Sequence, residues 1–379
     1  CTVAIETLSS CGPQTLPPAN GQQPRANSET LISVVPSDLY CTLDLLNCSE
    51  SGPIRTLAPE CPDQIHEIQI PIQLSSPHYP TGSAEFRFEE WSLVLIRVSI
   101  ASTDNRLSGV SQALDLIDSD VVIPDRPVMV KPNFVTTTNQ LAATHVDATR
   151  STLEYLSGKG VDQFIIAVGP AIGTPDSGFD NYGYRDLESD YKIEFMDLNT
   201  DDSIPVPAFD DHLIPQTLYM SKRLSESYVV SVCPMKTHNN VVVTLGLKNI
   251  LVGTLSGVEQ KRKIHKGSKA INLTLAKMAQ HVVPDLTIID GTIGMQGNGP
   301  IDGFEMPSNV VVASHHGIAA DVVGLQVMGY KLEQVGYLRY AMELRNLGLG
   351  DIEVVGKSIE DVKVTYADHD DIEEQLTWP

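Results

Sequence analysis

The stretch SYVVSVCPMKTHNNVVVTLGLKNI, residues 227–250, joins a buried-strand pattern to a run of cations and amides. Its first seven residues are rich in valine and carry no charge, which is typical of a strand covered on both faces. Lys236, His238, Lys248 and Asn249 follow that strand. The stretch therefore predicts a parallel sheet with polar side chains gathered where one strand ends.

Segments on either side repeat this alternation from Trp91 onward. Short apolar runs that we predict as strands cover residues 92–100, 126–135, 163–170, 285–291, 309–316 and 351–357. Segments with apolar residues at helical spacing cover residues 107–118, 149–160, 271–282, 317–330 and 332–348. We therefore predict an α/β domain over residues 91–379, with a mostly parallel, Rossmann-like sheet covered by helices. Ligands of such sheets bind at the carboxyl ends of the strands.

Residues 1–90 have a different composition. They contain 11 of the 24 prolines, five of the six cysteines and no lysine. We predict a loop- and strand-rich extension, stapled by disulfides and able to add strands to a neighbouring copy. The candidate disulfide cysteines are Cys11, Cys41, Cys48 and Cys61. Cys1 remains, and an amino-terminal cysteine fits a processed or lipidated terminus. An exported or cell-surface location is expected, with a cytoplasmic one as the alternative.

Net charge and hydropathy exclude two classes of partner. The 26 lysines and arginines against 48 acidic residues give a net charge of −22, which argues against nucleic acid as a partner. We find no run of the roughly 20 apolar residues that a membrane-spanning helix needs.

A local excess of positive charge stands out in this acidic chain. Residues 236–269 hold seven lysines and arginines and one acidic residue, Glu259. Such an island predicts capture of an anionic small molecule, phosphorylated or carboxylated. Lys131 and Asn133 end another predicted strand, and Asp290 ends a third. The predicted ligand-binding residues are Lys131, Asn133, Lys236, Lys248, Asn249 and Lys263. The predicted catalytic residues are His145, His238 and His265 as proton carriers and Asp290 as a base or cation ligand.

Metal and cofactor signals are weak. The sequence has no C-x-x-C pair and no histidines at zinc-finger spacing, so we predict no metal site and assign no cofactor. A redox or metal protein would have to use Cys233 with His238 and His265.

Six pieces of the chain resemble the family called domain of unknown function 362, in the order seen there. They are VMVKPNFV, THVDATRSTLEYLSGKG, CPMKTHNNVVVTLGLKNILVG, KIHKG, PDLTIIDGTIGMQGNGPIDG and IAADVVGLQVMGY. The resemblance covers about residues 93–357 and leaves the extension unmatched. It implies the α/β fold and no particular reaction. Some members carry ferredoxin-like cysteine clusters that this chain lacks, so we do not expect an iron–sulfur cluster.

Two departures from the family pattern bear on function. Gln296 stands where members usually have glutamate, and Ser314–Gly317 (SHHG) replaces an aspartate–proline pair. These departures favour an alternative: an exported structural or filament-forming protein with a vestigial pocket, which assembles through residues 1–90. The sequence leaves open whether the protein is an enzyme.

Overall fold

The computed structural model describes residues 3–7, 30–34, 40–43, 55–56, 84–87 and 95–379. The chain divides into two compact units, Cys1–Leu93 and Val94–Pro379. In the first unit, β1 (Val3–Thr7) pairs in parallel with β2 (Thr30–Val34) and β4 (Arg55–Thr56), and β3 (Tyr40–Leu43) pairs antiparallel with β5 (Ala84–Arg87). Cys1, Cys11, Cys48 and Cys61 lie outside the described residues. Cys41 is described only as part of the β3 backbone, so the disulfides and the assembly role stay predictions.

The second unit is built on a ten-stranded sheet in the order β17-β6-β16-β14-β12-β7-β8-β9, with β13 and β15 attached to β12 and β14. Its strands are β6 (Ile96–Ser102), β7 (Val128–Pro132), β8 (Phe164–Val168), β9 (Ile193–Asp197), β12 (Tyr228–His238), β13 (Val242–Thr244), β14 (Leu286–Gln296), β15 (Phe304–Met306), β16 (Val310–Ser314) and β17 (Ile352–Gly356). The pairs from β14 through β12, β7 and β8 to β9 are parallel, whereas β16 is antiparallel to β14 and β6. The predicted mostly parallel, helix-covered sheet is confirmed.

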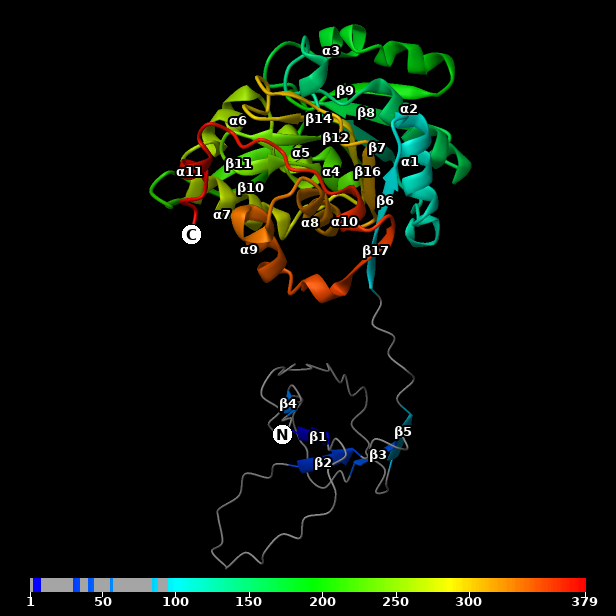
Figure 1. Ribbon diagram of the computed structural model, residues 1–379, viewed down its shortest axis with the longest axis vertical. Helices are drawn as coiled ribbons and strands as arrows, with labels where there is room; N and C mark the ends of the chain where they lie inside the picture. The colour runs from blue at the N-terminus through cyan, green and yellow to red at the C-terminus, as the bar shows by residue number, and fades with distance from the viewer. Residues whose placement is uncertain (1–2, 8–29, 35–39, 44–54, 57–83, 88–94) are drawn as a thin grey trace, which may run out of the picture. The chain divides into compact units, whose positions relative to one another are not determined.

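Helices cover both faces of this sheet, because the strand side chains alternate between two apolar cores. In β12, Tyr228, Val230 and Val232 face one core, and Val229 and Cys233 face the other. The first core is closed by α1 (Arg106–Asp115), α2 (Val146–Gly158) and α3 (Pro175–Asn181). The second is closed by α5 (Gly246–Gly253), α7 (Ser268–Ala279), α8 (Gly317–Val327) and α9 (Gly336–Leu344). Figure 1 shows α1 and α8 on opposite sides of β6 and β16.

The remaining elements lie around this framework. The strands β10 (Ser203–Phe209) and β11 (Pro215–Ser221) form an antiparallel hairpin whose Phe209 N–H donates to Thr274 Oγ1 in α7. Short helices are α4 (Arg223–Glu226), α6 (Val258–Ile264), α10 (Ile359–Val362) and α11 (Ile372–Gln375). Among the described residues, no helix is both long and apolar enough to cross a bilayer.

Two strands run further than the sequence predicts. We expected the strand of the opening stretch to end near Pro234 and the next to end at Asp290. Instead, β12 continues to His238 and β14 to Gln296. The pairing register of β12 on β14 shifts between Pro234 and Lys236, and an irregularity of this kind accommodates a residue without an N–H.

Candidate functional site

The site forms where β7, β8 and β12, which are neighbours in the sheet, reach their carboxyl ends. Lys131 lies near the end of β7, Gly169 directly after β8, and His238 at the end of β12. The chain then turns back through β13 into α5, which carries Lys248 and Asn249.

Two distant residues hold this hairpin and helix in place. Asp321 in α8 accepts from Gly246 N–H through Oδ1 (2.8 Å) and from Leu247 N–H through Oδ2 (2.9 Å). These N–H groups have no partner inside α5, so the Asp321 side chain caps the helix. Val242 has φ +67°, a left-handed conformation that a β-branched residue adopts only when its surroundings impose it. Its N–H donates to Gln375 Oε1 (2.7 Å).

Lysines and amides form a buried chain beneath the strand ends. Lys131 Nζ donates to Asn249 Oδ1 (2.7 Å), which also accepts from Asn133 Nδ2 (3.0 Å). Asn133 Oδ1 accepts in turn from Lys236 Nζ (2.7 Å), and Lys236 Nζ also donates to Ala142 O (2.8 Å). Four of the predicted residues from three segments are therefore joined by direct hydrogen bonds.

A second group places two histidines beside another lysine. His238 Nε2 lies 2.8 Å from Lys248 Nζ, and His238 Nδ1 accepts from Asn240 N–H (3.0 Å). The rings of His238 and His265 are stacked, with centroids 5.7 Å apart. His265 Nδ1 lies 2.6 Å from Lys261 O, so a neutral His265 carries its proton on Nδ1.

These groups line a cavity of about 280 Å³. Its polar lining includes Lys131, Asn133, His238, Lys248, Lys261 and His265. Lys236 is not part of the lining, but its hydrogen bond to Asn133 Oδ1 helps to hold that side chain in place.

Glycines give two of the lysines their space. A Cβ on Gly253 would collide with Lys131 Nζ, and a Cβ on Gly169 would lie 2.6 Å from Gly253 O and 3.2 Å from Lys261 Nζ. Lys131 and Lys261 therefore approach the same pair of backbone segments.

The lysines of the site are buried and form no ion pair among the described residues, although the charge of Asp197 opposes the effect of burial on the pKa of Lys261. Lys131, Lys236, Lys248 and Lys261 are at most 5% exposed, and none forms an ion pair in the part of the chain that the structure describes. Burial lowers the pKa of Lys131, Lys236 and Lys248 to about 7, and of Lys261 to about 8. Neighbouring lysines add to the effect on Lys131 and Lys248.

The histidines in the cavity are held neutral. Burial is the main cause that lowers the pKa of His238 well below its usual range and that of His265 to about 4.

Three of the predicted residues lie elsewhere. Lys263 is exposed on α6, and Lys261 takes the place expected for it. Asp290 is buried but pairs with Arg106 (Oδ2 to Nε, 2.6 Å) outside the cavity lining. His145 caps α2, where its Nδ1 accepts from Asp147 N–H (3.2 Å).

The two departures from the family pattern also leave the cavity untouched. Gln296 ends β14, where its Oε1 accepts from Ala367 N–H and its Nε2 donates to Glu305 O. Ser314 ends the antiparallel strand β16, and His316 caps α8. Neither segment belongs to the cavity lining.

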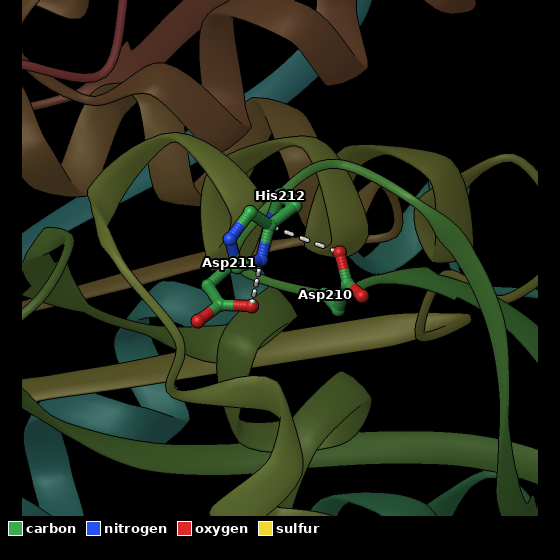
Figure 2. A group of neighbouring side chains, drawn as sticks. All are labelled: Asp210, Asp211 and His212. Carbon is green, nitrogen blue, oxygen red and sulfur yellow. Dashed lines mark hydrogen bonds and ion pairs between the residues drawn. The ribbon is translucent and has the colours of Figure 1, made fainter.

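One group of potential metal ligands occurs among the described residues, at the turn between β10 and β11 (Figure 2). Asp210 Oδ1 already accepts from the N–H groups of His212 (2.9 Å) and Ile214 (2.8 Å), and His212 Nδ1 lies 2.8 Å from Asp211 Oδ1. These contacts form a solvent-exposed turn. Burial raises the pKa of the Cys233 thiol. Among the described residues, Cys233, His238 and His265 do not come together as a group of potential metal ligands.

The fold and the cavity define a class: α/β proteins with a buried lysine, asparagine and histidine site at the carboxyl edge of a mixed sheet. The chain belongs to the family described as domain of unknown function (DUF362), whose model matches residues 128–326. That range includes every polar residue named in the cavity lining. The resemblance recognised in the sequence is confirmed.

Two known proteins are similar to this chain. A "thylakoid-associated protein sll1697" of Synechocystis sp. is 26% identical over 241 residues, which cover 61% of this chain and 73% of that protein. A crystal structure of a Thermotoga maritima protein has a TM-score of 0.36 at 12% identity, over 64% of this chain and 58% of that one. The chain thus spans less than two thirds of that structure, and the likeness adds nothing to the description of the fold.

Proposed function

We propose that this protein binds a small anionic molecule, with a phosphate or carboxylate group, in the cavity between Lys131 and Lys261. The observation that supports the proposal is the burial of lysine side chains that form no ion pair among the described residues. An uncompensated buried charge is strongly destabilising, and amides offset the cost only in part. An anion in the cavity supplies the missing charge.

The neighbouring groups suit such a ligand. Backbone at Gly169 and Gly253 approaches closely, so a small group fits against both lysines. Asn133 lines the same cavity, and the Nδ2 hydrogen that does not bond Asn249 is available to orient an oxygen-rich group. The positive cavity also explains how a chain of net charge −22 would capture an anion against its own field.

The test is sulfate binding by calorimetry, with Lys131→Met and Lys261→Met. A charge-assisted hydrogen bond contributes about 1.5–3 kcal/mol, so each variant should bind sulfate at least about tenfold more weakly. Lys263→Met is the matched control, because Lys263 is an exposed lysine on the same helix as Lys261.

Thermal unfolding separates binding from structure. Replacing a buried, unpaired cation by an apolar side chain of similar volume should leave the melting temperature unchanged or higher. If sulfate binds equally to Lys131→Met, Lys261→Met and Lys263→Met, the cavity is not the anion site.

A further inference from the structure

Two hydrogen bonds determine where His238 carries its proton. Asn240 N–H donates to His238 Nδ1 (3.0 Å), so Nδ1 presents a lone pair. A neutral imidazole with a lone pair on Nδ1 has its hydrogen on Nε2. The ring is buried among lysines, and its pKa is held well below the usual range, so the neutral form is present at pH 7.

The hydrogen bonds of His238 also determine whether the Lys248 amine is protonated. His238 Nε2–H points to Lys248 Nζ at 2.8 Å and must donate to it. Only an unprotonated amine has a lone pair that can accept this hydrogen. An ammonium group at this position would face the Nε2 hydrogen with its own hydrogens. The pKa of Lys248, lowered to about 7 mainly by burial, agrees with this assignment.

A neutral lysine in a ligand cavity is a nucleophile. Lys248 and His238 line the same cavity as Lys131 and Lys261. We propose that Lys248 forms an imine with an aldehyde or ketone group of the bound anion, an inference that rests on the proposed function. The substrate class is then a small carbonyl compound that also carries a carboxylate or phosphate.

The step balances without an oxidant or another reactant. The hydrogen bond from His238 Nε2–H to Lys248 breaks, the freed Lys248 lone pair attacks the carbonyl carbon, and a C–N bond forms. The carbonyl oxygen takes up both amine hydrogens and leaves as water, and the C–O bond is replaced by C=N. His238 Nε2–H, already within hydrogen-bonding distance, can give one hydrogen to the departing oxygen and recover one from the amine.

The first experimental arm tests the amine without an anion. The wild-type protein is treated at pH 7 with formaldehyde and a borane reductant, and methylated peptides are followed by mass spectrometry. With a pKa of about 7, Lys248 has about a thousandfold larger neutral fraction than a lysine of ordinary pKa. Lys248 should be modified before the exposed Lys263. If Lys263 reacts as fast or faster, the imine proposal is wrong, whether or not anions bind.

The second arm tests the anionic carbonyl, with pyruvate and cyanoborohydride. Pyruvate should be trapped on Lys248, sulfate should protect it, and Lys131→Met should reduce this trapping while formaldehyde labelling of Lys248 continues. Trapping spread over exposed lysines, equal in Lys248→Met and wild type, would overturn the imine proposal. Rapid formaldehyde labelling with no pyruvate trapping and no sulfate protection would instead overturn the anion site.

Discussion

Sulfate binding at pH 8 should take up protons from the solvent. Lys131 and Lys261 have pKa values of about 7 and about 8, so a large fraction of each amine is neutral before the ligand arrives. A bound anion favours the ammonium form and raises both pKa values. If both lysines become fully charged, uptake is about 0.9 protons at Lys131 and about 0.5 at Lys261, about 1.4 in all at pH 8.

Because sulfate binding takes up protons, the affinity for sulfate should rise as the pH falls. Below pH 7 both lysines already carry their protons, so uptake should fall to about 0.1 at pH 6. Integrating this proton uptake from pH 6 to pH 8 gives an affinity for sulfate that is about twentyfold higher at pH 6 than at pH 8. Sulfate is a suitable probe because its own charge is constant over this range.

Calorimetry in two cationic buffers of different ionisation enthalpy, Tris and imidazole, measures the uptake directly. Lys261→Met should lose about a third of the uptake at pH 8, and Lys263→Met should lose none. Tight binding with no uptake at pH 8, or weaker binding at pH 6, would show that the buried lysines are already charged and would refute the reasoning.

Two further substitutions test how the site is supported. Gly253→Ala places a methyl group against Lys131 Nζ, so it should lower the stability by about 1–3 kcal/mol and weaken sulfate binding. Gly350→Ala is the control, because Gly350 has open space around it and the change should have neither effect. Equal unfolding curves for the two variants would contradict this packing. Gln375→Ala leaves the buried N–H of Val242 without a partner and should cost about 1–3 kcal/mol in urea unfolding. An unchanged midpoint would show that the hairpin does not depend on Gln375.

The alternation of strands and helices could be predicted where a short apolar strand is followed by a helix, as at β6 with α1, β7 with α2 and β16 with α8. The strand ends could not be. Pro234 and Asp290 are both ordinary stop signals, yet they pair with each other across β12 and β14. The register shifts directly after this pair, and both strands continue beyond it, where β13 pairs with β12 and β15 with β14. Asp290 forms an ion pair with Arg106, which is distant in sequence. Such pairing is invisible in either segment alone.

The grouping of the lysines and asparagines could be predicted from their positions at strand ends, and the location of Lys263 outside the cavity lining has a recognisable cause. Helical spacing relates Val258 and Lys261 in α6 to His265, the residue directly after it. These residues lie on the side of the helix that carries the buried Ile264. That spacing, applied to the basic segment, would have selected Lys261 together with His265. The roles of Gln375 and Asp321 carry no local signal, because each acts on a residue far away in the chain.

Because Asn249 Oδ1 accepts two hydrogen bonds, the residues around it depend on one another when the sequence changes in evolution. It accepts from both Lys131 and Asn133, and Asn133 in turn holds Lys236. Replacing Asn133 or Asn249 removes hydrogen bonds from two buried neighbours at once, so a change at either asparagine is disfavoured unless its neighbours change with it. We expect these four positions to covary across related sequences, each lineage keeping the whole set or exchanging it together.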